Sequence, residues 1–484
     1  MMPPRPFFEA EGGSSDARRL LLISPVFPPA EHVGALRWQK MAPYLAERGW
    51  ELDVIAVHPD FLHSPDWHRL AELPPGTRVY GVRPPRHRVA RLIELVWKLI
   101  RRVSSRTSPR RHDNVHSRSQ PGVSGRPESL ARSEIRWSLT DPRAYIRAYH
   151  AWAAHAELVR SARDMTALAV RVAVPGLHEA IISAGPPHAA HEAARLASMR
   201  TGLPFVMDMR DVWSLTQRFQ EGIASPLLFH LARRAERRAI DRAALVVANT
   251  GVAALAMRRT YPEAAERIIT VMNGSDDEPL PPSQYGLQFV VAHAGTIYLD
   301  RNPLNLFRAA KRVIDDLRLL PDQLALKFMG ENGGSVSLTD LAEAEGIGAF
   351  VQVEGPRPRA EAMKFLARAG MLVILHQDSD MAIPAKVFEY VRFEAWLLAL
   401  AELGSATELV LRDTDADIVS SRDISGIAAV LTRRYQQYAA GVRPGPAAGD
   451  GRLSRRVQAE ILLDAIERRV TRNRVRWHAC STVV

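Results

Sequence analysis

Short apolar runs alternate with helical patterns through most of this chain, and this alternation limits the fold more than any other feature. The first half carries six such runs, at Arg19–Ser24, Glu51–Val57, Ala180–Ser183, Pro204–Asp208, Ala244–Ala248 and Ile268–Met272. The second half carries five, at Phe289–His293, Leu324–Met329, Phe350–Val353, Leu372–His376 and Leu397–Ala401. Helical patterns follow at Ala35–Glu47, Asn305–Leu317, Arg359–Ala369 and Pro384–Phe393, among others. Buried strands that alternate with helices form parallel sheets covered on both faces. We therefore predict an α/β protein with two Rossmann-like, doubly wound domains.

An acidic, proline-rich break at Asp276–Gln284 divides the two halves, and we place the domain boundary there. The predicted parts are a tail at 1–18, an N-terminal domain at 19–275, a linker at 276–286, a C-terminal domain at 287–440, and a linker with a helix at 441–484. The helix is predicted near Val457–Val470. Open parallel sheets bind ligands beyond the carboxyl ends of their strands. We therefore expect the site in a cleft between the domains.

The net charge of +11 is concentrated in one insertion. Residues 81–150 contain 16 Arg and Lys against five Asp and Glu, which accounts for the whole excess. A nucleic-acid-binding domain would place basic and aromatic side chains on its folded elements, so we predict no nucleic acid partner. Within the insertion, Arg88–Arg102 is a basic amphipathic segment, typical either of a helix on an anionic membrane surface or of a helix packed on its own domain. The following residues, 103–129, have the composition of a mobile loop.

The sequence also predicts a cellular location. No apolar run approaches the roughly 20 residues that span a bilayer, and Met1–Ala10 has no signal-peptide core behind it. The one cysteine, Cys480, fits a reducing compartment and excludes a thiolate zinc cluster. We predict a cytoplasmic protein, held through 88–102 at the inner face of the plasma membrane.

Two segments of the C-terminal half are candidates for binding phosphate. In Ala382–Tyr390, Lys386 and Glu389 share one face at the start of a helix, where a phosphate would gain an ammonium group and free backbone N–H groups. Glu389 is then placed to accept from ribose hydroxyls; the simpler interpretation is a surface ion pair. In His293–Pro303, Gly295 ends a strand and allows close approach of a phosphate, and Arg301 can make a bidentate contact.

Candidate residues of the N-terminal half follow three strands. Gly34 opens the first helix after the first strand, where the alternative is a plain turn. His188 follows the strand that ends at Ser183, and Asp208, Arg210 and Asp211 follow the next one. His188 and His191 lack the companion ligands of a metal site, and for either histidine alone a structural or capping role is equally compatible with the sequence.

Taken together, these segments resemble the family-4 retaining glycosyltransferases of the GT-B fold, most closely the bacterial branch that builds capsular and other surface polysaccharides. The resemblance runs from about 19 to 438, outside 81–150. It rests on these segments in this order: SPVFPP with Gly34, SAGPPH, VMDMRDVW, VVANT, VMNGSD, HAGTIYLDRNP and IPAKVFEY. It implies sugar transfer with retention from a UDP- or GDP-linked sugar to a glycan or polyprenyl-linked acceptor, without a resident cofactor or metal.

The resemblance also assigns roles to matched positions. Glu389 corresponds to the second glutamate of the family's E-x7-E element, which holds the donor ribose, while Lys386 and Arg301 would neutralise the donor diphosphate. Gly34, Gly295 and Thr296 are the other donor-binding candidates, and the two glycines would lie against that diphosphate. Asp208, Arg210, Asp211 and His188 fall where the family contacts the acceptor and the donor sugar, and no catalytic residue is assigned.

Two positions depart from the family's pattern. Met381 stands where the first glutamate of the element is expected, and Thr296 stands where an arginine usually follows the glycine. Met381 leaves a second hypothesis open, a non-catalytic binding or scaffold protein on a decayed transferase fold. A third is a sugar-nucleotide epimerase, which can share the two-domain architecture.

Overall fold

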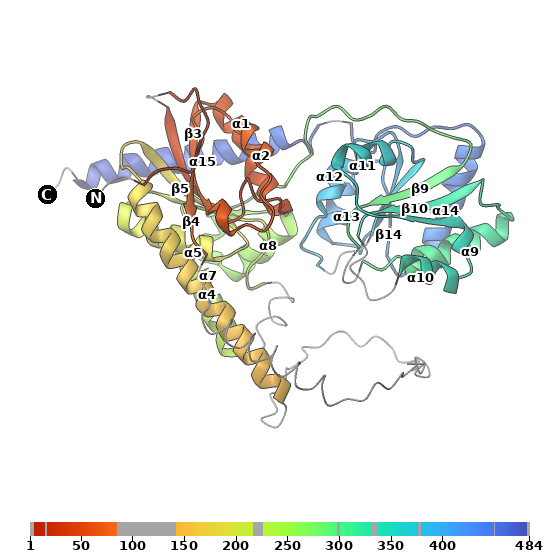
Figure 1. Ribbon diagram of the computed structural model, residues 1–484, viewed down its shortest axis with the longest axis horizontal. Helices are drawn as coiled ribbons and strands as arrows, with labels where there is room; N and C mark the ends of the chain where they lie inside the picture. Colours follow the sequence, from red (N-terminus) through yellow and green to blue (C-terminus); the bar gives the residue numbers. More distant parts are fainter. Residues whose placement is uncertain are drawn as a thin grey trace.

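The computed structural model describes residues 4–14, 17–84, 142–215, 226–297, 301–331, 337–375, 379–449 and 451–481. It contains two α/β domains side by side, each built on its own sheet (Figure 1). The predicted amphipathic segment at 88–102 and the predicted loop at 103–129 lie outside the described residues.

The N-terminal domain is built on an eight-stranded sheet in the order β1-β4-β3-β2-β5-β6-β7-β8. Only β1 is antiparallel to its neighbour. The strands are β1 Phe8–Glu9, β2 Arg18–Ile23, β3 Trp50–Val57, β4 Arg78–Val82, β5 His178–Gly185, β6 Phe205–Met209, β7 Leu245–Ala248 and β8 Ile268–Thr270. The helices are α1 Leu36–Glu47, α2 His68–Ala71, α4 Pro142–Val172, α5 Ala189–Thr201, α7 Pro226–Arg242 and α8 Gly251–Thr260.

Alternation along the central strand divides the N-terminal core into two layers. Leu21 and Ile23 of β2 pack with α4, α5, α7 and α8 on one face of the sheet. Leu20 and Leu22 pack with α1 and α2 on the other face. All four side chains are fully buried, so this strand shows the continuous apolar run that a parallel strand covered on both faces requires.

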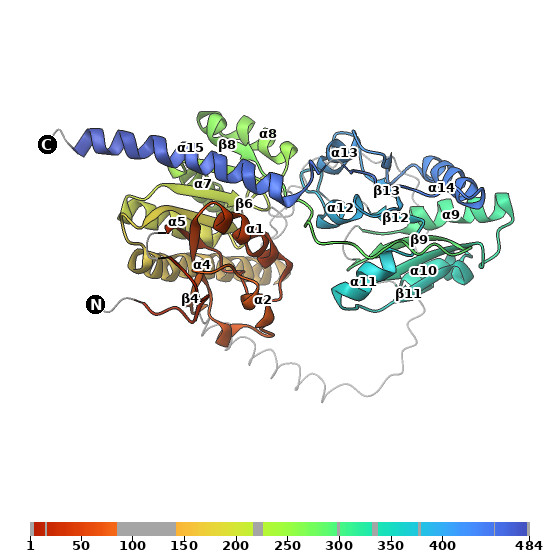
Figure 2. The same ribbon diagram turned by 90° about the horizontal axis from the view of Figure 1, so that it is seen from above.

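The last helix, α15 Arg455–Ser481, returns to the N-terminal domain. Its residues Ala459, Leu462 and Ile466 are buried in the same layer as α1, and Figure 2 shows α15 running along this domain. Arg455 donates to the carbonyl of Asn273 and pairs with Asp276, which fixes the start of the helix to the end of the N-terminal domain. The chain therefore crosses between the domains twice.

The C-terminal domain is built on a six-stranded parallel sheet in the order β11-β10-β9-β12-β13-β14. Its strands are β9 Phe289–Ala294, β10 Leu324–Met329, β11 Val351–Glu354, β12 Met371–Ile374, β13 Trp396–Leu400 and β14 Asp417–Val419. Its helices are α9 Leu304–Leu317, α10 Leu338–Ala344, α11 Arg359–Leu366, α12 Ala385–Tyr390, α13 Ala406–Leu411 and α14 Ile424–Ala439. The sheet is again covered on two faces, by α9 and α14 and by α11 to α13. Two parallel sheets, each buried on both faces, confirm the predicted fold class.

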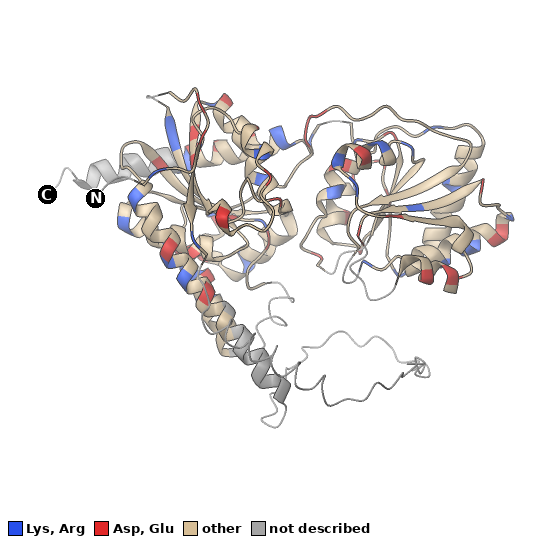
Figure 3. Cartoon of the chain, in the orientation of Figure 1, with Lys and Arg blue, Asp and Glu red and all other residues tan. Residues whose placement is uncertain are grey.

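Charged side chains of both signs are intermingled over the described parts of the two domains (Figure 3). Most of the basic insertion falls outside the described residues, at 85–141. Among the described residues, no helix combines the length and the apolar character that crossing a bilayer requires.

Candidate functional site

The end of β9 forms the centre of the candidate site in the C-terminal domain. Gly295 follows the strand with φ +117°, a backbone conformation that favours glycine. A Cβ atom at this position would lie 2.6 Å from both Cε and Nζ of Lys386. Tyr390 fixes the strand end, because its hydroxyl accepts from the N–H of Ala294 at 2.8 Å and donates to the carbonyl of the same residue at 3.2 Å. The missing side chain at 295 is therefore what admits the lysine to the end of the strand.

Lys386 is held in place by a buried histidine. Its Nζ lies 2.9 Å from Nε2 of His293, and Nδ1 of His293 lies 2.8 Å from the carbonyl oxygen of Val373 on β12. His293 is 3 % exposed. The contact joins β9, β12 and α12 at the carboxyl edge of the sheet, which is where open parallel sheets bind their ligands.

The electrostatics of this site would favour the binding of an anion, because a buried amine and a guanidinium lie close together. Burial lowers the pKa of Lys386 to about 7, assisted by the nearby Arg301 charge and opposed by Glu389. Burial and the Lys386 charge hold the pKa of His293 well below its usual range, so its imidazole is neutral. A bound anion would restore the charged form of Lys386, since an opposite charge nearby favours ionisation.

Of the remaining predicted donor-binding residues, Glu389, Thr296 and Arg301 belong to this domain, whereas Gly34 lies in the N-terminal domain. Glu389 forms an ion pair with Arg359, the first residue of α11. Thr296 is exposed, and Arg301 is partly buried at the chain segment that enters α9. The helix α12 spans Ala385–Tyr390, shorter than the predicted Pro384–Phe393, because the chain turns before β13. A helix this short has a small dipole, so the positive charge at the site comes mainly from the side chains of Lys386 and Arg301.

In the N-terminal domain, the fold brings three predicted segments together around Arg210. Gly34 lies in a 3₁₀ turn, Val33–Ala35, and a Cβ atom there would lie 1.9 Å from Nη1 of Arg210. Arg210 also donates to the carbonyl of Pro186, and its backbone N–H donates to the carbonyl of Gly185 at 2.9 Å. The loops after β2, β5 and β6 thus meet at one guanidinium, and Gly34 leaves the space that it fills.

Asp208 occupies a different environment from the other candidates. It is fully buried, and its carboxylate accepts two hydrogen bonds from Arg37 at 2.9 Å each and one from the Trp38 indole at 2.7 Å. Arg37 further donates to the carbonyl of Val271. These bonds tie α1 to β6 and to the end of the N-terminal domain, which gives Asp208 a structural role. Its predicted contact with substrate stays a prediction, as does that of Asp211, which is exposed.

His188 lies at the start of α5, where its side chain makes no capping hydrogen bond. Its ring stacks on Trp213, with centroids 4.8 Å apart and planes 10° from parallel. Burial, with His191 and Arg210 alongside, holds the pKa of His188 well below its usual range. Nδ1 of His188, Nε2 of His191 and Nε1 of Trp213 have no hydrogen-bond partner among the described residues. Over all the residues that the structure describes, no group of three or more His, Cys, Asp or Glu side chains is placed to hold a metal ion.

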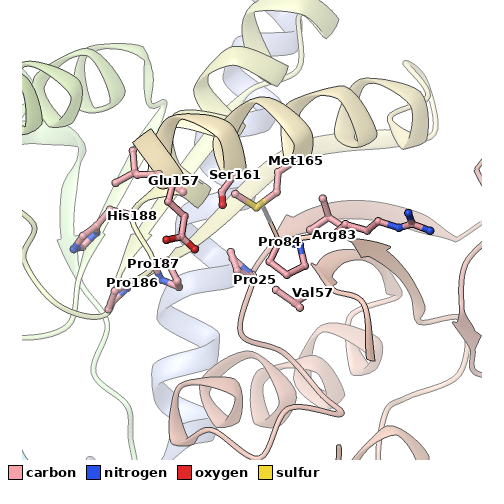
Figure 4. A pocket seen from close by; sticks show the side chains of 13 residues that line it. Pro25, Val57, Arg83, Pro84, Glu157, Ser161, Met165, Pro186, Pro187 and His188 are labelled. Carbon is pink, nitrogen blue, oxygen red and sulfur yellow. The ribbon is translucent and has the colours of Figure 1, made fainter. Parts of the chain in front are cut away.

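A cavity of about 420 Å³ opens beside these loops (Figure 4). Its walls come from the carboxyl ends of β3 and β4, the loops after β2 and β5, and the side of α4. The walls are mostly apolar, including Val57, Pro84, Leu158 and Met165. The carboxylate of Glu157 points into the space. Its size and apolar lining match a small-molecule site.

One contact links the two domains close to both sets of candidates. The Thr250 hydroxyl, at the start of α8, donates to the carbonyl of Met381 at 2.6 Å. The Met381 side chain is partly buried and packs against the core of the N-terminal domain. Met381, which stands where the resemblance predicts a glutamate, therefore contributes to the contact between the domains.

Several residues of these sites were not predicted. The sequence showed Arg37 only as a polar residue in a predicted helix, and nothing indicated that it would contact Asp208. His293 stood inside a strand pattern, and its contact with Lys386 joins segments 93 positions apart. Glu157 follows the basic insertion in a region that no motif covered. Only His293 could have been singled out, as a polar residue in an otherwise apolar strand.

Comparison with known proteins places this geometry among two-domain α/β proteins. No protein-family model matches the chain. Among curated proteins, it is similar to D-inositol 3-phosphate glycosyltransferase 1 of Catenulispora acidiphila, with 29% identity over 197 residues. That match covers 37% of this chain and 46% of the relative, so the chain spans about half the length of the curated protein it matches.

Solved structures match over nearly the whole chain. The N-terminal domain of trehalose-6-phosphate phosphatase from Candida albicans has a TM-score of 0.57 at 13% identity and covers 96% of this chain and 99% of its own. Sucrose-phosphate synthase from Thermosynechococcus elongatus has a TM-score of 0.52 at 10% identity, with 96% and 100% covered. At such identities these likenesses establish the fold alone.

Proposed function

We propose that this chain is a glycosyltransferase that takes a sugar from a nucleotide-sugar donor, UDP- or GDP-linked, and transfers it with retention to a lipid-linked or growing glycan in surface polysaccharide synthesis. The observation that carries the proposal is the pair of cationic side chains at the end of β9, where Gly295 admits the Lys386 amine and Arg301 lies nearby. A diphosphate placed there would be stabilised as it leaves, because positive groups aimed at developing negative charge lower the barrier. The curated similarity to a glycosyltransferase supports the same activity.

The apolar cavity of the N-terminal domain supports the acceptor half of the proposal. It lies at the carboxyl edge of its sheet, as the pair of cationic side chains does in the other domain. An acceptor with a hydrocarbon portion would bury that portion among Val57, Leu158 and Met165, gaining roughly 25 cal/mol for each Å² removed from water. The basic segment 88–102 would hold the protein at the anionic membrane surface from which such an acceptor is presented.

Thermal stability in the presence of nucleotide sugars tests the proposal. UDP-sugars and GDP-sugars are added one at a time to the full-length protein, and at least one is expected to raise the melting temperature, since a ligand that binds only the folded state stabilises it. Glu389→Ala should abolish the shift. Glu345→Ala is the matched control, because Glu345 forms an exposed ion pair with Arg308 on α9 in the same domain. The proposal fails if no nucleotide sugar shifts the wild type, or if both variants respond as the wild type does.

A non-catalytic binding protein on the same fold is the second candidate. Met381 favours it, because a thioether that packs in the domain contact cannot accept hydrogen bonds from sugar hydroxyls as a carboxylate does. Turnover separates the two. Release of UDP or GDP with transfer of the sugar to a membrane-extracted acceptor supports the transferase, whereas binding of the nucleotide sugar without transfer supports the second candidate. An epimerase would instead convert the sugar nucleotide without any acceptor.

A further inference from the structure

The contact between His293 and Lys386 fixes which nitrogen of the imidazole carries the proton. The carbonyl of Val373 can only accept a hydrogen bond, so Nδ1 of His293, 2.8 Å away, is the protonated nitrogen. Nε2 then presents a lone pair, and Nζ of Lys386 donates to it at 2.9 Å. The histidine is thereby a neutral acceptor that aims the amine along the end of β9.

Among the described residues, the groups around the amine provide it with no full countercharge. The charged and titratable groups of this part of the chain that face the amine are His293 on β9, Arg301 before α9, and Glu389 on the same helix. Glu389 is already paired with Arg359 of α11, which divides its charge between two cations. Tyr390 is engaged with the backbone of Ala294. A dianionic diphosphate would supply the amine with the negative charge that these described groups do not provide in full.

We infer that His293 is a positioning residue for the donor diphosphate and that Lys386 takes up one proton when a nucleotide sugar binds. The inference rests on the proposed function, since it assumes a nucleotide-sugar donor at this site. The ammonium forms by addition of one solvent proton to the free amine, and the donor diphosphate itself gains and loses none. Binding therefore favours low pH and becomes weaker as the pH rises.

The size of the pH effect on binding follows from the pKa of the Lys386 amine in the free protein. Burial lowers its pKa to about 7, and the bound diphosphate raises it again. The contribution of the Lys386 charge to the free energy of binding is therefore fully present below pH 7 and is lost progressively as the pH rises above 7. If the bound amine stays protonated throughout, the dissociation constant rises about 50-fold from pH 7 to pH 9, and close to one proton is taken up per ligand at pH 8.

Calorimetry measures that proton directly. The full-length protein is titrated with the nucleotide sugar that gives the largest thermal shift, at pH 6, 7, 8 and 9, in pairs of buffers that differ in ionisation enthalpy. A nucleotide sugar serves better than the free diphosphate, because its diphosphate is esterified at both ends and does not titrate in this range. We expect uptake near one proton at pH 8. Uptake below about 0.3 proton, with binding intact, overturns the inference and leaves the proposed function standing; absence of binding at every pH overturns both.

Variants at 386 assign the proton to the lysine. Lys386→Arg substitutes a guanidinium that is charged at all these pH values, so the uptake should fall close to zero and the dissociation constant should become flat between pH 7 and 9. Lys386→Met removes the charge and should also abolish uptake, with at least tenfold weaker binding. Uptake that persists in both variants overturns the inference, and the second variant keeps the test valid if the guanidinium does not fit.

A pair of variants at 293 tests the histidine. His293→Gln can donate to Val373 through its amide N–H and accept from Lys386 through its oxygen, whereas His293→Phe fills the space and does neither. We expect about tenfold weaker binding and a lower midpoint of the pH profile for His293→Phe, and values near the wild type for His293→Gln. Equal pH profiles for the wild type and His293→Phe would show that the imidazole only packs, and would overturn its positioning role.

Discussion

The buried ion pair between Arg37 and Asp208 gives the sharpest stability prediction. The Arg37 and Asp208 side chains are at most 3 % exposed, and the carboxylate accepts three hydrogen bonds, two from Arg37 and one from Trp38. Arg37→Met keeps most of the side-chain volume and removes the guanidinium. Asp208 is then left charged in the core, which costs about 3–5 kcal/mol in buried pairs of this kind. That loss is a large fraction of the ~5–15 kcal/mol by which domains are stable.

Urea unfolding followed by tryptophan fluorescence measures the loss. Trp38, Trp50 and Trp213 are buried in the N-terminal domain and Trp396 in the C-terminal domain, so the measurement uses a Trp396→Phe background, in which the buried tryptophans report the N-terminal domain. With a denaturant slope of about 3 kcal/mol per M, the midpoint should fall by roughly 1–1.7 M. Arg48→Met is the control, because Arg48 pairs with Asp464 at the surface, where such pairs contribute less than about 1 kcal/mol.

A double-mutant cycle separates the pair from its surroundings. Adding Asp208→Asn to Arg37→Met removes the unpaired charge, so the double variant should be more stable than the sum of the single losses predicts. Donor binding in the C-terminal domain should be unchanged in all folded variants. An Arg37→Met loss below 1 kcal/mol, or strict additivity, would refute the structural role of Asp208 and return it to the set of substrate-contact candidates.

Three further predictions concern the apolar cavity and the basic insertion. Ser161→Trp places a large side chain from α4 in the apolar cavity and should raise the acceptor KM at least tenfold without changing nucleotide-sugar binding. Val159→Trp, at a solvent-exposed position of the same helix, should change neither quantity. Equal kinetics for the two variants would show that the cavity is not part of the acceptor site. Replacing the arginines of 88–102 with glutamine should reduce sedimentation with anionic vesicles, and a wild type that never sediments would show that the charge has another purpose. Deleting 104–129 should leave the urea midpoint unchanged, and a shift of more than about 0.5 M would show that this segment contributes to the fold.

Local patterns predicted most of the strands and helices, since each is specified within a few residues of sequence, but β1, which lies inside the predicted tail at 1–18, β4 and β14 were not predicted. The run at Leu324–Met329 coincides with β10, and Arg19–Ser24 differs from β2 by one residue at each end. Boundaries were less certain where tertiary structure ends an element. The helix at Pro384–Phe393 was predicted too long because the turn into β13, and not a residue signal, stops it at Tyr390.

Contacts between distant segments could not be predicted. Asp208 was singled out as a polar residue at a strand end, and it lies on β6, but nothing in the sequence indicated that its partner Arg37, 171 positions away on α1, is buried against it. The helix near Val457–Val470 was predicted, yet its apolar positions did not indicate that it packs beside α1. Likewise Lys386 was a candidate from its local setting, while its orientation depends on His293 and on the space above Gly295.

Hydrogen–deuterium exchange with and without a nucleotide sugar tests the central claim most directly, because it locates the donor without presupposing which residues bind it. The account predicts slower exchange in peptides that cover 293–297 and 385–391, with little change in the N-terminal strands, and predicts that this protection disappears in Lys386→Met. Protection confined to the N-terminal domain, or protection at 293–297 that persists undiminished without the lysine, would contradict it.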